Sequence, residues 1–98
     1  MRLLRVKPPW SVRVRMADAA YVYILLCEDG SLYTGWTTDV EKRFSAHCSG
    51  RGARYTRAHR PVRVVYREGF ATKQEAMRRE AAVKKLSRAE KQRLCGLE

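Results

Sequence analysis

Two short apolar and aromatic runs, separated by one turn sequence, constrain the fold of this chain more than any other feature. The first run spans Ala20–Cys27 and the second spans Leu32–Thr37, with Glu-Asp-Gly-Ser between them. An Asp-Gly pair between two such runs is the strongest short-range signal for a β-hairpin. Side chains alternate between the faces of a strand, so Tyr21 and Tyr23 are expected to point the same way.

The tyrosines of this hairpin are the first candidate functional side chains. In a simple pairing of the two strands, Tyr23 and Tyr33 become neighbours, and two phenols then lie close together near a basic surface. The ordinary alternative is that these residues are β formers that fill a half-buried sheet.

A helix is expected from about Asp39 to Ser49. Asp39 offers an N-cap side chain. Apolar residues follow it at helical spacing, namely Val40, Phe44 and Cys48. Arg43 and His47 are four residues apart, which places both on one face of this helix. The alternative is that this face is the solvated side of an amphipathic helix.

The segment from Gly50 to Arg60 is expected to be a loop, because glycines open it and Pro61 follows it. It carries basic residues interleaved with an aromatic one: Arg51, Arg54, Tyr55, Arg57 and Arg60. This mixture suits a nucleic-acid backbone with a base or sugar beside it. The alternative is an ordinary basic surface loop.

A third strand and two more helices are expected in the last part of the chain. The strand covers about residues 62–70, where valines and an aromatic residue cluster. Capping boxes begin both helices, and their residues are Thr72 with Glu75, and Ser87 with Glu90. The final helix is short and ends near Leu94.

Glu80 is the clearest physical pointer to function. It shares a helical stripe with Ala76 and Val83, on the side expected to meet the sheet. A carboxylate there is costly unless a cation or a metal offsets its charge. Pattern alone leaves open a glutamate at the helix edge that pairs with Arg79, Lys84 or another cation.

The charge balance predicts a polyanionic partner. The 98 residues form a single expected domain and carry 21 Lys+Arg against 10 Asp+Glu, a formal net charge of +11. Nucleic acid is the first expectation and an anionic membrane surface the second. No apolar run is long enough to span a bilayer.

Cysteine and histidine usage excludes several further classes. Three cysteines lie far apart and 2 histidines lack metal-ligand spacing, which argues against a disulfide framework and against zinc. Reduced thiols in a cytoplasmic protein are expected. Residues 1–16 are basic and are expected to be a flexible extension, or sequence upstream of a true start at Met16, before a domain over residues 17–98.

The candidate residues match the needs of phosphodiester hydrolysis. A carboxylate such as Glu80 can hold a hard divalent cation, which offsets charge on the phosphate and on the leaving oxygen. Arg43 carries a permanent, planar charge that can grip phosphate oxygens. Tyr23 is the candidate base, although a phenol needs nearby positive charge to act near neutral pH. His47 can relay a proton or orient a phenol.

The ordered set Tyr-Val-Tyr, Tyr-Thr-Gly, Arg, His, Glu resembles the GIY-YIG endonuclease superfamily. It looks most like the small single-domain bacterial branch of the UPF0213 type, over Ala20 to about Leu86. The resemblance implies an α+β fold in which a small three-stranded antiparallel sheet is flanked by helices. It also implies a mechanism with a single divalent ion, Mg²⁺ or Mn²⁺, acting on nucleic acid, with DNA preferred.

The resemblance assigns roles by position. The catalytic set that it implies is Tyr23, Tyr33, Arg43, His47 and Glu80, with Glu80 as the metal ligand. Gly35 of the second motif joins the basic residues of segment 50–60 on the nucleic-acid surface. The chain departs from the family where Tyr21 replaces Gly, where Thr34 replaces Ile, and in having no Asn, which many members use late in the domain.

Three functional hypotheses remain open at this point. The first is a metal-dependent endonuclease that acts on DNA, structure-specific or related to repair. The second is a nucleic-acid-binding module that does not cut, within a repair or RNA-processing assembly. The third, weaker one is a structural adaptor of such an assembly. Most members of the superfamily carry an extra domain, so a protein partner that supplies specificity is also expected.

Overall fold

The computed structural model describes residue 15 and residues 17–97, so the basic extension expected over residues 1–16 lies outside the described residues apart from Arg15. Within the described part, one antiparallel sheet contains β1 (Ala20–Cys27), β2 (Leu32–Thr37) and β3 (Pro61–Phe70) in the order β2-β1-β3. The three strands and the α+β class are those that the sequence predicts.

The hairpin between β1 and β2 forms at the Asp-Gly pair. Gly30 has φ +85°, a left-handed conformation that glycine adopts without a steric cost. The carboxylate of Asp29 accepts from the backbone nitrogen of Ser31 at 3.0 Å, which is an Asx turn. In the register that results, Tyr23 lies opposite Gly35. Tyr33 is offset along β2, and its ring centroid is 6.4 Å from that of Tyr23, so the two phenols are the expected neighbours.

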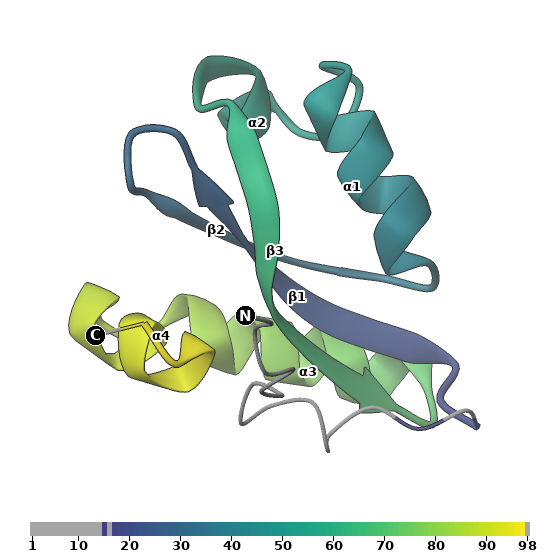
Figure 1. Cartoon of the computed structure of the whole chain (residues 1–98). Coiled ribbons are helices and arrows are strands. Elements are labelled where there is room, and N and C mark those ends of the chain that lie inside the picture. The colour runs from purple at the N-terminus through teal and green to yellow at the C-terminus, as the bar shows by residue number, and fades with distance from the viewer. Residues whose placement is uncertain (1–14, 16, 98) are drawn as a thin grey trace, which may run out of the picture.

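Helices cover both faces of the sheet (Figure 1). α1 (Val40–Cys48) covers one face, with α2 (Arg54–Ala58) beside it. α3 (Lys73–Lys84) and α4 (Arg88–Cys95) lie on the opposite face. The expected caps form, because Asp39, Thr72 and Ser87 each accept a hydrogen bond from a backbone nitrogen in the first turn of a helix.

Each face of the sheet has its own small core. The core under α3 and α4 consists of Ala20, Val22, Ile24, Val65, Tyr66, Ala76, Val83 and Cys95. The core under α1 consists of Tyr23, Leu25 and Val40, with Tyr21, Tyr33, Phe44 and Val64 packed against it. β1 contributes alternate residues to the two cores, and the odd-numbered set that includes Tyr23 faces α1.

The expected loop over residues 50–60 is wrong in part, because it contains the five-residue helix α2. Thr56 explains how this short helix begins: its hydroxyl oxygen lies 3.2 Å from the backbone nitrogen of Ala53 and 3.1 Å from the carbonyl oxygen of Ala53. A helix of 5 residues is too short to produce a recognisable apolar period.

The three cysteines are free thiols, with Cys27 and Cys95 buried and Cys48 exposed. No helix among the described residues is both long enough and apolar enough to cross a membrane.

Candidate active site

Tyr23 and His47 form a buried hydrogen-bonded pair at the centre of the sheet face under α1. Tyr23 extends from the middle of β1 and His47 from the last turn of α1. Each residue is 1% exposed, and the Tyr23 hydroxyl lies 2.8 Å from Nε2 of His47. The docking of α1 on the sheet therefore brings together two side chains that the sequence separates by 24 positions.

The other ring nitrogen of His47 meets Thr56, a residue that sequence reasoning did not select. The Thr56 hydroxyl oxygen lies 2.7 Å from Nδ1 of His47, and Thr56 is 2% exposed. Gly52 was also missed. A Cβ atom on Gly52 would lie 2.1 Å from Nδ1, so only a glycine leaves room for the ring. A threonine and a glycine inside a basic segment form no motif that predicts a functional role. The one available signal was the pair of glycines at 50 and 52, which is compatible with another group packing closely against the backbone.

Gly35 has a similar relation to Tyr23. The residue is buried, and a Cβ atom on it would lie 2.6 Å from the Tyr23 hydroxyl oxygen and 2.8 Å from Cζ. The phenol ring thus covers the glycine opposite it on β2, an arrangement often seen where an aromatic residue shields a glycine across strands. The geometry shows that Gly35 makes room for the Tyr23 ring. Direct contact between Gly35 and nucleic acid stays a prediction.

Arg43 is exposed one helical turn before His47. It lines a surface hollow with Trp36, Thr37, Thr38 and Lys73, and an adjoining hollow that Lys42 also lines. The exposed guanidinium can meet an anion in these hollows, and two lysines add positive charge beside it.

Burial sets the protonation states of the central pair. Burial, assisted by the neighbouring phenol of Tyr33, raises the pKa of Tyr23 well above 10, and the opposing effect of Arg43 is smaller. Burial also lowers the pKa of His47 from 6.5, with a further lowering by Arg43. Both groups are therefore neutral near neutral pH. The positive charge of Arg43 alone therefore does not bring the pKa of the phenol toward neutral pH, because desolvation has the larger effect.

Aromatic rings extend the site toward the β1–β2 turn. Tyr33 meets His47 edge-on at a centroid distance of 5.1 Å and stacks with Tyr55 at 5.7 Å. Tyr55 in turn stacks with His59 at 4.1 Å. The sequence-predicted residue Tyr55 is therefore part of the same cluster as Tyr33.

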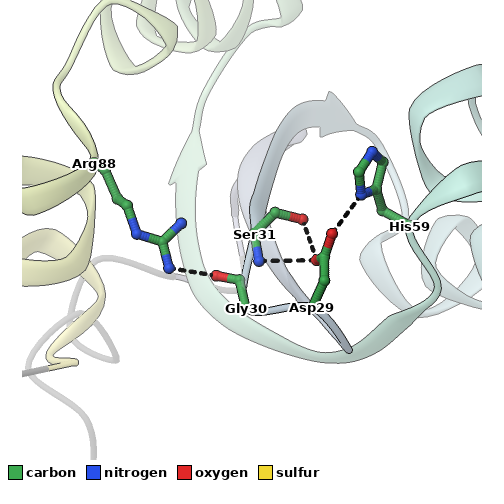
Figure 2. Close-up of polar contacts among 5 residues, drawn as sticks. All are labelled: Asp29, Gly30, Ser31, His59 and Arg88. Carbon is green, nitrogen blue, oxygen red and sulfur yellow. Dashed lines mark hydrogen bonds and ion pairs between the residues drawn. The ribbon is translucent and has the colours of Figure 1, made fainter.

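A set of polar contacts holds this end of the hairpin in place (Figure 2). Asp29 lies between Ser31 and His59, and its carboxylate is 2.6 Å from Nδ1 of His59. On the other side of the turn, Arg88 of α4 donates to the carbonyl oxygen of Gly30 at 2.7 Å. Hydrogen bonds from Ser31 hold the pKa of Asp29 well below its usual range, and His59 adds to this effect. The turn is therefore tied to both helical layers.

The four predicted arginines of segment 50–60 do not share one position. Arg57 and Arg60 line a hollow together with His47, Thr56 and Ser49. Arg51 and Arg54 are exposed near the start of α2.

Glu80 lies on α3, and its side chain is 20% exposed. Its carboxylate oxygen is 3.3 Å from Nζ of Lys84, one helical turn away, which is the ion pair that the sequence left open as an alternative. Its charge makes the smallest of the contributions that raise the pKa of Tyr23, and no direct contact joins it to Tyr23 or His47 among the described residues. An i,i+4 pair with one well-exposed partner contributes little stability, and Lys84 is 53% exposed.

The described residues contain no group of three or more acidic, histidine or cysteine side chains that could hold a metal. A single partly exposed carboxylate nevertheless fits Mg²⁺, which keeps several waters and takes one or two protein carboxylates together with substrate phosphate oxygens.

Comparisons with known proteins identify the family of this chain. The sequence matches the family described as the GIY-YIG catalytic domain over residues 19–93. A UPF0213 protein of Streptococcus agalactiae is 56% identical over 72 residues, which cover 74% of this chain and 82% of that protein.

Two solved structures are also similar. The solution NMR structure of a UPF0213 protein from Bacillus halodurans is 55% identical, with a TM-score of 0.51, and the match covers 79% of this chain and 82% of that one. The solution NMR structure of a protein from E. faecalis is 49% identical, with a TM-score of 0.52, over 74% and 78% of the two chains. The chain therefore belongs to the GIY-YIG catalytic domain family, a family of nucleases that act on nucleic acids.

Proposed function

We propose that this protein is a metal-dependent endonuclease that hydrolyses phosphodiester bonds in DNA. The observation that carries the proposal is the buried hydrogen-bonded chain Tyr23–His47–Thr56, with the exposed guanidinium of Arg43 beside it. Burying three polar side chains is unfavourable unless each is satisfied, and a fully satisfied chain holds its members in fixed positions.

Tyr23 and His47 act in the proposal as one proton-accepting pair. As an attacking water gives a proton to the phenol oxygen of Tyr23, the original phenol proton moves to Nε2 of His47. Tyr23 then never has to ionise alone, which its raised pKa opposes. Tyr33, edge-on to the His47 ring, completes the aromatic wall of the site. Arg43 binds and offsets the charge of the phosphate.

Glu80 would hold a Mg²⁺ or Mn²⁺ ion. Such an ion supplies charge stabilisation for the phosphate and for the leaving oxygen when it is bound. Lys84 would leave its ion pair with Glu80 as the metal binds, because a divalent cation offsets the carboxylate charge more strongly.

The basic surface around the site would carry the DNA. Arg57 and Arg60 line the hollow beside His47, Arg54 and Tyr55 lie in the first turn of α2, and Arg51 precedes this helix. The formal charge of +11 favours any polyanion, so a partner protein or the shape of the DNA would supply specificity, as in a structure-specific or repair-related nuclease.

Cleavage of labelled single-stranded, duplex, flap and junction DNA, and of RNA counterparts, tests the proposal. Purified protein is incubated with Mg²⁺, with Mn²⁺ and with a chelator. Cutting of at least one DNA form that stops with the chelator supports the proposal, and cutting of RNA alone contradicts the DNA assignment.

A non-cleaving nucleic-acid-binding module is the second candidate. The observation that favours it is the Glu80–Lys84 pair, which occupies the one carboxylate that the proposal gives to a metal. Tight binding of every substrate without cutting of any, in either metal, would establish this second function instead.

A further inference from the structure

We infer that Thr56 is a positioning residue that fixes the tautomer of His47, with the proton on Nδ1 and the lone pair of Nε2 directed at Tyr23. The effect of Thr56 on cleavage rests on the proposed function, whereas its effect on the tautomer does not.

The Thr56 hydroxyl has three polar neighbours, and two arrangements of its proton are possible among them. Its oxygen lies 3.1 Å from the carbonyl oxygen of Ala53, 3.2 Å from the backbone nitrogen of Ala53 and 2.7 Å from Nδ1 of His47. A hydroxyl has one proton and two lone pairs. The Ala53 carbonyl can only accept and the Ala53 amide can only donate. If the hydroxyl donates to the carbonyl, its lone pairs accept from the amide and from a proton on Nδ1.

This arrangement satisfies every group in the chain. With the proton on Nδ1, Nε2 has a free lone pair and accepts from the Tyr23 hydroxyl at 2.8 Å. In the opposite arrangement Thr56 donates to Nδ1, and Nε2 carries a proton that it donates to the Tyr23 oxygen. The phenol proton of Tyr23 then has no acceptor among the described residues, since His47 is its one polar partner there.

Burial makes this difference decisive. Tyr23, His47 and Thr56 are each at most 2% exposed, so a hydrogen-bonding group that is left without a protein partner there is costly. The neutral ring is the form that has a tautomer to select, and burial keeps His47 neutral near neutral pH by lowering its pKa. Gly52 adds steric control, because the ring occupies the space that a Cβ atom on this residue would take.

The selected tautomer is the one that the proton relay needs. Nε2 can take the Tyr23 proton while the Tyr23 oxygen takes a proton from water. Nδ1 keeps its own proton throughout and donates it in a hydrogen bond to the Thr56 oxygen. The other tautomer has no lone pair facing Tyr23. A buried partner that holds a histidine in the productive tautomer is a known catalytic device on unrelated folds.

Nitrogen-15 NMR of histidine-labelled protein tests the assignment directly at neutral pH without any substrate. The chain has 2 histidines, and a His59→Gln variant identifies the signals of His47. The expected result is a protonated Nδ1 and an unprotonated Nε2 in the wild type. A protonated Nε2 in the wild type, or a doubly protonated ring, overturns the inference.

Variants at Thr56 then test the cause. Thr56→Val keeps the shape of the side chain and removes its hydroxyl, so the population of the Nδ1-protonated form should fall. Thr56→Ser keeps the hydroxyl and should retain the wild-type tautomer. Thr34→Val is the matched control, because Thr34 is also buried but its hydroxyl has no partner among the described residues. An unchanged tautomer in a folded Thr56→Val protein overturns the inference.

The activity arm uses the DNA substrate that the wild type cuts best. General acid–base catalysis contributes about 10²–10⁴-fold, so Thr56→Val should lower kcat by roughly a hundredfold with KM nearly unchanged. Thr56→Ser and Thr34→Val should stay within a few-fold of the wild type. If Thr56→Val lowers the population of the Nδ1-protonated form but leaves kcat unchanged, the inference that this tautomer is needed for cleavage is overturned. If the wild type cuts no substrate, the proposed function fails. The NMR experiment still tests the tautomer in that case, because it uses no substrate.

Discussion

Replacing Gly35 with alanine should displace the Tyr23 phenol from His47. The new Cβ atom would lie 2.6 Å from the Tyr23 hydroxyl oxygen, about 0.8 Å short of the 3.4 Å at which ordinary contact begins. The phenol cannot rotate into solvent, because Tyr23 is 1% exposed and His47 lies 2.8 Å beyond its hydroxyl. Relief therefore requires movement of the ring, of β2, or of both.

The cost follows from two opposing effects. Overpacking of a well-packed site costs about 1–3 kcal/mol. Alanine regains roughly 0.5–1 kcal/mol in a strand because it loses less backbone entropy than glycine on folding. The expected net loss is thus about 1–2 kcal/mol, which lowers Tm by roughly 5–15 °C in a domain of this size.

Thermal unfolding of Gly35→Ala in two backgrounds isolates the contact. Tyr23→Phe removes the hydroxyl oxygen, the atom nearest to the new methyl group, so the cost of Gly35→Ala should be smaller in Tyr23→Phe than in the wild type. Binding to DNA should be unchanged because Gly35 is buried, while cleavage should fall as the phenol leaves His47.

Two outcomes would refute this reasoning. An equal cost in both backgrounds would show that the methyl group does not press on the phenol. A Gly35→Ala protein that melts like the wild type but binds DNA weakly would give Gly35 the direct surface role that the sequence predicted.

Three further predictions concern pH, salt and the hairpin turn. The pKa of His47 is lower in the folded protein than in the unfolded chain, so acid protonates this residue more readily in the unfolded state. The free energy of unfolding should therefore keep the full contribution of neutral His47 above about pH 6.5 and lose it as the pH falls through the lowered folded-state pKa. His47→Gln should reduce this pH dependence in urea melts. DNA affinity should fall steeply with salt, with a log–log slope of about −0.9 for each phosphate contacted, and Arg43→Gln should reduce the slope by about one such contact; a flat titration contradicts the electrostatic account. Asp29→Ala should speed hydrogen exchange at the Ser31 amide, because the Asp29 carboxylate accepts a hydrogen bond from that amide, while Tm should change little because the turn is exposed. Unchanged exchange would show that the carboxylate is not needed to order the turn.

Much of the fold was predictable from local sequence signals. The Asp-Gly pair predicted the hairpin, and the capping residues Asp39, Thr72 and Ser87 predicted where three helices begin. These signals are reliable because each acts within a few residues of the structure that it forms.

The parts that were missed depend on contacts between distant segments. Thr56 acquires its role because α2 places its hydroxyl against a ring nine positions earlier in the chain. Gly52 and Gly35 matter for the space that they leave to His47 and Tyr23, which no local pattern records. The sequence indicated that Tyr23 needs nearby positive charge to act near neutral pH, but the burial that raises its pKa is a property of the whole fold.

Glu80 shows the limit of pattern reasoning most clearly. The helical stripe predicted a carboxylate near the sheet with a cationic or metal partner. The side chain is 20% exposed and pairs with Lys84, one of the cations that the sequence offered as its partner.

The most direct test of the central claim is single-turnover DNA cleavage by Glu80→Gln, with DNA binding and thermal unfolding measured on the same preparation. The substitution keeps the volume of the side chain and removes the anionic ligand. Glu28→Gln, a change of the same charge at an exposed turn, is the matched control. We predict that Glu80→Gln folds and binds DNA like the wild type but cuts at least a hundredfold more slowly, since loss of charge stabilisation in a transition state commonly costs about 10²–10³-fold. Wild-type cutting by a folded Glu80→Gln protein would contradict the metal-dependent mechanism.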